Sequence, residues 1–194
     1  PNNPTGTLLT DNEIYNFLSK VPARIPVVLD QAYYEYLDTR DQAIDWLNVF
    51  DNLIITRTFS KAYGLAGLRV GYSVSRADIA DYINRVRAPF NVNHNAQIAA
   101  IAALNDVDYL QESVRSNAQG IKQLEECFKN LNLNYIKSSA NFIAVEFDNA
   151  LETYEKLLKE GVIVRPIEIP NFLRISVGTA EENVYLIQTL KKIL

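Results

Sequence analysis

The sequence has few of the residues that disulfide frameworks, zinc sites and nucleic-acid surfaces require. Its single cysteine, Cys127, cannot form an internal disulfide. Cys127 and the single histidine, His94, are also too few ligands for a structural zinc site. The formal net charge of −4 is opposite in sign to that of a typical nucleic-acid-binding face. No apolar run reaches the roughly 20 residues that span a bilayer. We therefore expect no nucleic-acid or membrane partner and a reducing, cytoplasmic location.

The first six residues read PNNPTG, a dense turn motif, with no initiator Met, charged leader or apolar signal core. We expect a chain that starts inside such a motif to be part of a longer protein. The remaining composition, 48 % hydrophobic and 22 % charged, is that of an ordinary soluble globular protein.

The first part of the chain predicts strands that alternate with helices. A capping box from Thr10 to Glu13 should open a helix that ends near Lys20. Three short apolar runs have the character of buried strands: 26–30, 53–58 and 68–74. This alternation predicts an α/β fold with a mostly parallel sheet and flanking helices.

After Ser75 the pattern changes to long helices followed by a small α+β unit. The expected elements are helices over 77–87 and 93 to about 131, an alternating strand over 141–147, a helix capped by Asp148 that ends at Gly161, strands over 162–165 and 172–176, and a last helix opened by a capping box at 179–182. We place a domain boundary near residue 115, which separates a large domain (1–115) from a small C-terminal domain (116–194).

Reactive side chains gather where the predicted strands end. Ligands of open α/β sheets bind beyond the carboxyl ends of the strands. Asp30 follows one strand, and Thr58, Ser60 and Lys61 follow another. Together with nearby glycines, the hydroxyls and Arg69 could cradle a phosphate dianion. The segment is no P-loop, because it has no glycine-rich turn that ends in Gly-Lys-Ser/Thr.

Five blocks, in this order and spacing, resemble the class I/II (fold-type I) aminotransferases, and most of all histidinol-phosphate aminotransferases. The blocks are NNPTG (2–6), DQAY (30–33), SKAYGLAGLR (60–69), VRP (164–166) and FLRISVG (172–178). The resemblance covers the whole chain and implies the C-terminal half of such an enzyme. It implies the second half of the large domain that binds pyridoxal 5'-phosphate, followed by the small domain.

The resemblance implies a role for each residue near the cofactor. Lys61 would hold pyridoxal phosphate as a Schiff base and shuttle the substrate proton, for which its amine must be neutral. Asp30 would face the pyridine nitrogen and keep it protonated. Asn3 and Tyr33 would hydrogen-bond the 3-oxygen of the ring. The Asn3–Pro4 bond is expected to be cis.

The resemblance also implies the anion sites. The cofactor phosphate would be bound by Thr58, Ser60 and Arg69. Arg174 matches the arginine that receives a substrate carboxylate or phosphate, and Arg165 matches one associated with substrate phosphate; guanidinium suits both anions. The segment 165–171 is shorter than is usual in the family and carries Glu168. A carboxylate that faced the pocket would disfavour a phosphorylated substrate.

Each residue also has a plainer interpretation. A lysine after a strand is usually a solvated surface residue, and an aspartate there, such as Asp30, usually caps a turn. Arg165 could be an exposed strand residue. His94 is interpreted as a polar loop residue, and Cys127 as a small buried hydrophobe. The five blocks together favour the catalytic interpretation of Lys61 and Asp30.

The leading hypothesis is transamination between histidinol phosphate and 2-oxoglutarate, with a homodimer as the expected assembly. An aromatic amino-acid aminotransferase shares the same blocks. A threonine-phosphate decarboxylase would use Lys61 and Asp30 with a different bond aligned over the ring. The non-enzyme alternative is an inactive fragment or interaction module that kept the fold. The half of the enzyme outside this chain would complete the pocket, so we expect this stretch alone to be inactive.

Overall fold

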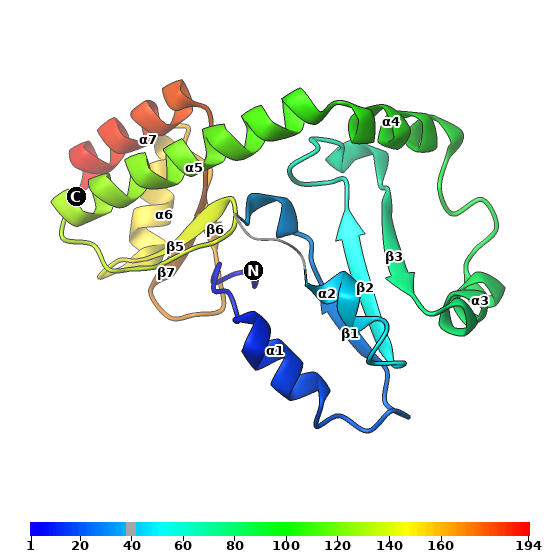
Figure 1. The fold of residues 1–194 in the computed structure, drawn as a ribbon. Helices are drawn as coiled ribbons and strands as arrows, with labels where there is room; N and C mark the ends of the chain where they lie inside the picture. The colour runs from blue at the N-terminus through cyan, green and yellow to red at the C-terminus, as the bar shows by residue number, and fades with distance from the viewer. Residues whose placement is uncertain (38–41) are drawn as a thin grey trace. The chain divides into compact units, whose positions relative to one another are not determined.

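The computed structural model describes residues 1–37 and 42–194 (Figure 1). The chain forms two compact units. The central unit is Leu9–Gln111, and the terminal unit joins Pro1–Leu8 to Glu112–Leu194. The first eight residues, which a single boundary near residue 115 would place in the large domain, group with the C-terminal part of the chain. Among the described residues, no helix combines the length and the apolar character needed to cross a membrane.

The sheet of the central unit has the order β1-β2-β3, from β1 (Val27–Asp30), β2 (Leu53–Thr58) and β3 (Gly71–Ser75). β1 and β2 are parallel, but β3 runs antiparallel to β2. The expectation of a mostly parallel sheet is therefore wrong: this sheet is mixed. The connection between β2 and β3, residues 59–70, is described throughout and holds only the 3-10 turn η2 (Ala66–Leu68). A parallel return usually passes through an α-helix, and this connection contains none.

One face of this sheet is covered by the helices that precede β1 and β2. α1 (Asp11–Leu18) begins at the predicted capping box, in which Thr10 and Glu13 exchange hydrogen bonds. α2 (Ala43–Trp46) is a single turn. The shared core consists of Leu18, Ala43, Trp46, Leu53 and Ile55. Residues 53 and 55 of β2 therefore point into the core, and residue 57 lies on the same side by the two-residue period of a strand.

The predicted helical stretch from 93 to about 131 is two helices, α4 (His94–Asn105) and α5 (Val107–Asn130). Asp106 separates them, and its carboxylate accepts a hydrogen bond from the Tyr109 N–H at 3.1 Å. Such a side chain satisfies a free donor of the first turn, which favours a new helix start. The predicted helix over 77–87 is α3 (Ala77–Val86). A second core in the central unit joins Phe59, Val70, Ala96 and Ala100.

The terminal unit is an antiparallel sheet with helices packed against it (Figure 1). The strands are β4 (Tyr135–Ile136), β5 (Phe142–Glu146), β6 (Arg165–Pro166) and β7 (Phe172–Ser176), in the order β4-β5-β7-β6. The helices are α5, α6 (Ala150–Lys159) and α7 (Ala180–Ile193). The core includes Leu124 and Phe128 from α5, Ile143 and Val145 from β5, Leu157 from α6, Leu173 and Ile175 from β7, and Leu186 and Leu190 from α7.

Three local predictions in the terminal unit are corrected. The N-cap of α6 is Asn149 rather than Asp148, because the Asn149 side chain accepts from the Glu152 N–H. Residues 142–145 of β5 are all buried instead of alternating, so both faces of this inner strand are covered. The predicted strand over 162–165 pairs only at Arg165–Pro166, because Val162 still donates to Leu157 in the turn that ends α6.

Candidate active site

Asp30 ends β1, and its carboxylate is held by the backbone. Its Oδ1 accepts the Ala32 N–H at 2.9 Å. The ladder between β1 and β2 continues one residue further, where the Gln31 N–H donates to the Thr56 carbonyl at 2.9 Å. The side chain of Asp30 remains exposed. A carboxylate fixed in this way at a strand end can pair with a cationic group of a ligand.

Lys61 lies in a tight turn beyond β2. The Gly64 N–H closes the turn by donating to the Lys61 carbonyl at 2.9 Å, and Gly64 has a φ of +70°. A Cβ at that position would come within 2.7 Å of the Tyr109 hydroxyl, the end of an exposed side chain that can shift, so the left-handed backbone is the stronger reason for glycine there. The Lys61 Nζ lies 5.2 Å from the centroid of the Tyr33 ring, and Tyr33 is buried. The ammonium form thus receives a cation–π contact.

Donors suited to an anion gather directly after β2. The Thr58 hydroxyl accepts the Ser60 N–H at 3.1 Å. The Arg69 Nη1 donates to the Ser60 hydroxyl at 3.4 Å and to the Ala66 carbonyl at 2.9 Å. Arg69 has a left-handed φ of 54°, which is uncommon for any residue but glycine. This backbone places a guanidinium beside a hydroxyl, a combination that binds a tetrahedral dianion.

The sequence reasoning missed Arg57, whose side chain joins β2 to the turn after β1. Its Nε and Nη2 both donate to the Gln31 Oε1 at 3.0 Å. Its Cζ lies 4.2 Å from the centroid of the Tyr34 ring. One signal in the sequence could have identified Arg57: it is an arginine where the two-residue period of the strand predicts an apolar residue.

The sequence reasoning also missed Glu35, a carboxyl group among tyrosines in η1 (Tyr34–Tyr36). Burial raises its pKa, and the charge of Arg57 partly opposes this shift. Among the described residues, the Glu35 Oε2 is buried without a hydrogen-bond partner. Burial and the negative charge of Glu35 raise the pKa of Tyr36 to about 12, and the same two causes raise the pKa of Tyr63. These phenols therefore stay protonated at neutral pH.

The terminal unit contains a separate cavity of about 430 Å³ with two arginines. Its lining is Asn3, Pro4, Arg165, Pro166, Ile167, Glu168, Ile169 and Arg174. Arg165 of β6 and Arg174 of β7 are direct cross-strand partners. Like charges placed directly opposite each other repel. An anion between the two guanidinium groups would relieve this repulsion.

Arg174 is the better-fixed of the two arginines. Its Nη1 donates to the Asn3 Oδ1 at 2.7 Å, and its Cζ lies 4.8 Å from the centroid of the Phe142 ring. The Nε is buried and has no hydrogen-bond partner among the described residues. A buried charged donor without a partner is costly, so it favours an incoming acceptor.

The predicted site residues thus lie in both units. Asp30, Tyr33, Thr58, Ser60, Lys61 and Arg69 belong to the central unit, and Asn3, Arg165 and Arg174 belong to the terminal unit. The Asn3–Pro4 peptide bond is cis, as predicted. Glu168 lines the same cavity as the two arginines.

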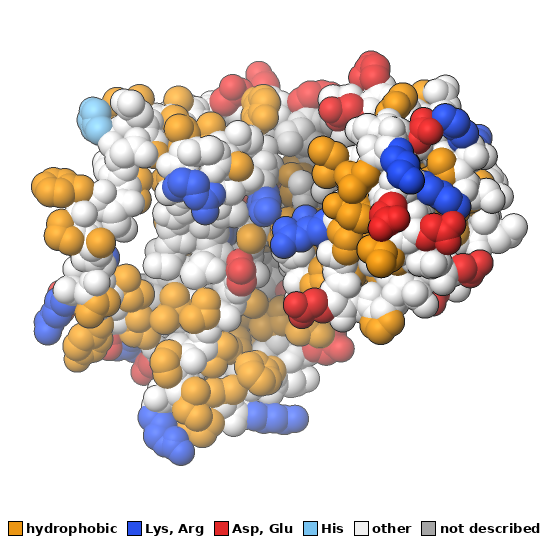
Figure 2. All heavy atoms as spheres, turned by 180° about the vertical axis from the view of Figure 1, so that it is seen from behind, with side chains coloured by type: hydrophobic (Ala, Val, Ile, Leu, Met, Phe, Trp, Pro, Cys, Tyr) orange, Lys and Arg blue, Asp and Glu red, His pale blue; other side chains and the backbone are white. Residues whose placement is uncertain are grey.

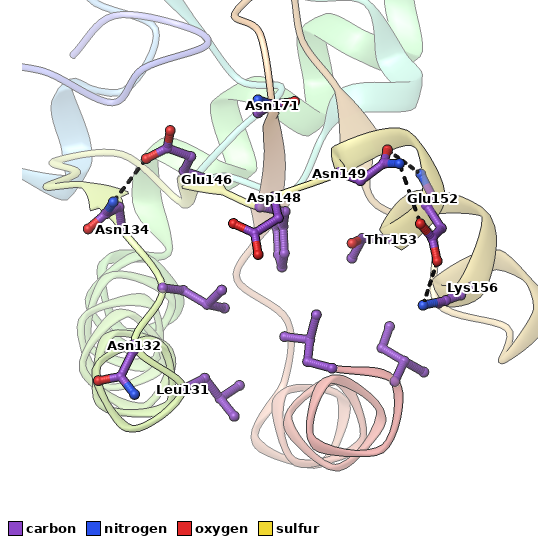
Figure 3. A pocket seen from close by; sticks show the side chains of 14 residues that line it. Leu131, Asn132, Asn134, Glu146, Asp148, Asn149, Glu152, Thr153, Lys156 and Asn171 are labelled. Atoms are coloured by element: carbon purple, nitrogen blue, oxygen red, sulfur yellow. Dashed lines mark hydrogen bonds and ion pairs between the residues drawn. The ribbon is translucent and has the colours of Figure 1, made fainter.

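A larger cavity in the terminal unit, of about 610 Å³, offers fewer free polar groups to a ligand. Several of its polar side chains are paired with one another: Asn134 with Glu146, and Glu152 with both Asn149 and Lys156 (Figure 3). Cys127 is buried, which confirms the prediction of a small buried hydrophobe, and burial raises the pKa of its thiol. Among the described residues, no group of three or more His, Cys, Asp and Glu side chains could hold a metal ion.

Comparison with known proteins finds one family along nearly the whole chain. The family model for aminotransferase class I and II matches residues 1–190. A histidinol-phosphate aminotransferase of Methylobacillus flagellatus is 50 % identical over 199 residues, which cover 100 % of this chain and 54 % of the relative. Histidinol-phosphate aminotransferase 2 of Pseudomonas fluorescens is 52 % identical over 200 residues, again covering 100 % of this chain and 54 % of the relative.

A solved structure shows the same fold. The histidinol-phosphate aminotransferase of Sinorhizobium meliloti, crystallised in complex with pyridoxal-5'-phosphate, matches with a TM-score of 0.89 and 30 % identity. The match covers 100 % of this chain and 56 % of that one. The chain therefore spans about half the length of the relatives it matches. The family model, which matches nearly every residue, decides the assignment: this chain belongs to the class I and II aminotransferase family.

Proposed function

We propose that the protein to which this chain belongs is a histidinol-phosphate aminotransferase that uses pyridoxal 5'-phosphate and transfers the amino group to 2-oxoglutarate. The observation that carries the proposal is the position of Lys61, half-buried beside the Tyr33 ring, in the β2–β3 connection that also holds the Ser60–Arg69 pair. The relatives that are about half identical to this chain are named for the same activity.

The residues present fit this cofactor. The Thr58 and Ser60 hydroxyls and the Arg69 guanidinium form the donor set that a phosphate group needs, and Arg69 already contacts Ser60. Asp30 offers a carboxylate, oriented by the Ala32 N–H, that would pair with a protonated ring nitrogen. Lys61 would hold the cofactor covalently, and Tyr33 would hydrogen-bond its ring oxygen. When bound, pyridoxal phosphate supplies a ring that withdraws electrons from the substrate Cα.

Within this reaction, Lys61 moves the proton. Its Nζ, as a free amine, would accept the proton of the substrate Cα and deliver it to C4′ of the cofactor, which is general acid–base catalysis by a positioned side chain. The buried Tyr33 ring against Lys61 limits the directions in which the lysine chain can turn. Asp30 would keep the nitrogen at the far end of the cofactor ring protonated, which would favour removal of that Cα proton.

The terminal unit would recognise the substrate. Arg174 has the buried unpartnered Nε and would bind the substrate carboxylate or phosphate, while Arg165, directly opposite, would bind the phosphate of histidinol phosphate. Glu168 in the same cavity is the observation that favours a second candidate, an aromatic amino-acid aminotransferase. A carboxylate beside the arginines weakens the binding of a phosphate dianion more than that of an uncharged ring.

The proposal also covers the place of this chain in the whole enzyme and the assembly of that enzyme. We infer that the chain forms the second half of the large cofactor-binding domain and the small C-terminal domain of a cytoplasmic homodimer. Large apolar side chains stand exposed on the central unit, as Figure 2 shows for one face. They include Val28, Tyr72, Tyr82, Val86, Phe90, Ile98, Ile101 and Leu104. Exposed apolar surface of this kind supports the inference that this unit packs against further protein. The mass of the full-length protein in solution tests the dimer.

The full-length protein, incubated with pyridoxal phosphate, tests the function. We expect a visible absorption band that Lys61→Ala abolishes. Histidinol phosphate should bleach this band faster than phenylalanine, and glutamate should bleach it as the second amino donor. Equal rates with phenylalanine and histidinol phosphate would instead support the aromatic aminotransferase. A protein that forms no band would refute the cofactor assignment.

A further inference from the structure

Arg57 lies in β2 at a position where the alternation of core-facing residues predicts an apolar side chain. Leu53 and Ile55 point into the core between the sheet and the helices α1 and α2. Arg57 follows on the same side and is only partly buried. Its side chain lies beyond this core, against the turn after β1, where Gln31 and Tyr34 hold it.

The guanidinium fixes this turn at two points. Both Nε and Nη2 donate to the Gln31 side chain, and the Cζ of the group lies over the Tyr34 ring. Gln31 is also held through its backbone, since its N–H donates to the Thr56 carbonyl. Asp30 directly precedes these anchored residues in the chain, and Tyr33 lies between them.

We propose that Arg57 is a positioning residue for the reaction proposed above: it sets the placement of Asp30 and Tyr33 relative to Lys61. The inference rests on the proposed function. Arg57 is the residue before Thr58, so its backbone belongs to the strand that leads to Lys61. Its side chain holds the turn that presents the groups facing the ring. Arg57 therefore links the strand that leads to Lys61 with the turn that carries Asp30 and Tyr33.

A lysine cannot replace this contact. Two parallel donors on one acceptor and a flat cation over an aromatic ring are properties of guanidinium, and an ammonium has neither the plane nor the fork. Arg57 also attracts the Glu35 carboxylate, whose buried Oε2 has no hydrogen-bond partner among the described residues. Loss of the guanidinium would thus loosen the turn and leave the Glu35 charge less compensated.

The test uses the full-length protein with bound pyridoxal phosphate and compares Arg57→Lys with Arg76→Lys. Arg76 is an exposed arginine of the central unit that pairs with Asp51 and serves as the matched control. For Arg57→Lys we expect kcat to fall roughly 10- to 100-fold, the range that a small misplacement of reacting groups produces, with KM changed less than about threefold. The pH midpoint of the visible band should shift, and Arg76→Lys should leave kcat, KM and midpoint unchanged.

Gln31→Ala provides the second measurement. If Arg57 acts through Gln31, the double variant should lose little more kcat than either single variant, because the two residues share one contact. An Arg57→Lys protein with a lower melting temperature but the wild-type band midpoint and kcat would show a structural role alone and overturn the inference. Losses that multiply in the double variant would also overturn it. A wild-type protein without the visible band would refute the proposed function itself, and this inference with it.

Discussion

Replacing Arg165 by glutamine tests two effects of the opposed arginines: the repulsion between them in the free protein and the binding of a substrate phosphate. Arg165 is exposed and stands directly across from Arg174 in the β6–β7 pair. The substitution keeps a side chain of moderate length and hydrogen-bonding capacity but removes one charge. It should therefore remove the repulsion in the free protein and, at the same time, one of the two charges that would bind a phosphate.

The two effects have opposite signs and different sizes. Cross-strand pairs contribute roughly 0.2–1 kcal/mol, so relief of the repulsion should leave the free energy of unfolding unchanged or raise it by up to about 1 kcal/mol. A hydrogen bond to a charged group contributes about 1.5–3 kcal/mol. Its loss corresponds to a decrease in kcat/KM for histidinol phosphate of roughly 10- to 150-fold, since about 1.4 kcal/mol is a factor of ten.

Steady-state kinetics and urea unfolding of the full-length protein measure both effects. With glutamate, whose carboxylate Arg174 would bind, kcat/KM for Arg165→Gln should fall less than about threefold. Arg115→Gln is the matched control, because Arg115 is an exposed arginine of the terminal unit that pairs with Glu112. Equal losses with both substrates, or a protein destabilised by several kcal/mol, would refute the assignment of Arg165 to the phosphate.

Three further outcomes follow from the structure. Glu168→Gln, which removes a carboxylate from the cavity of the two arginines, should lower KM for histidinol phosphate severalfold; an unchanged or higher KM would show that Glu168 does not act on the phosphate. Gly64→Ala should reduce the free energy of unfolding by about 1–3 kcal/mol, because the left-handed backbone and the Tyr109 hydroxyl both oppose a Cβ; an unchanged urea midpoint would contradict this. Cys127 should react with a thiol reagent only as the protein unfolds, because it is buried and its thiol pKa is raised; rapid reaction of the native protein would disprove it.

Local signals in the sequence were sufficient for much of the secondary structure. The capping boxes at Thr10 and Thr179 form as predicted, and β2 and β7 have the bounds that their apolar runs indicate. Each of these features depends on hydrogen bonds or side-chain periodicity within a few residues, so neighbouring residues determine it. The motif blocks likewise pointed to Lys61, Asp30 and the arginines before any contact was known.

Contacts between distant residues required the tertiary structure. The antiparallel direction of β3, the opposition of Arg165 and Arg174, and the hydrogen bond from Arg174 to Asn3 depend on how strands pair and on residues far apart in sequence. The contact between Arg57 and Gln31 joins positions 26 residues apart. The sequence by itself determined which side chains are available for chemistry, because residue types and local spacing are written in it. Only the folded chain decided which of them meet, because strand register and packing depend on the whole set of contacts rather than on any one segment.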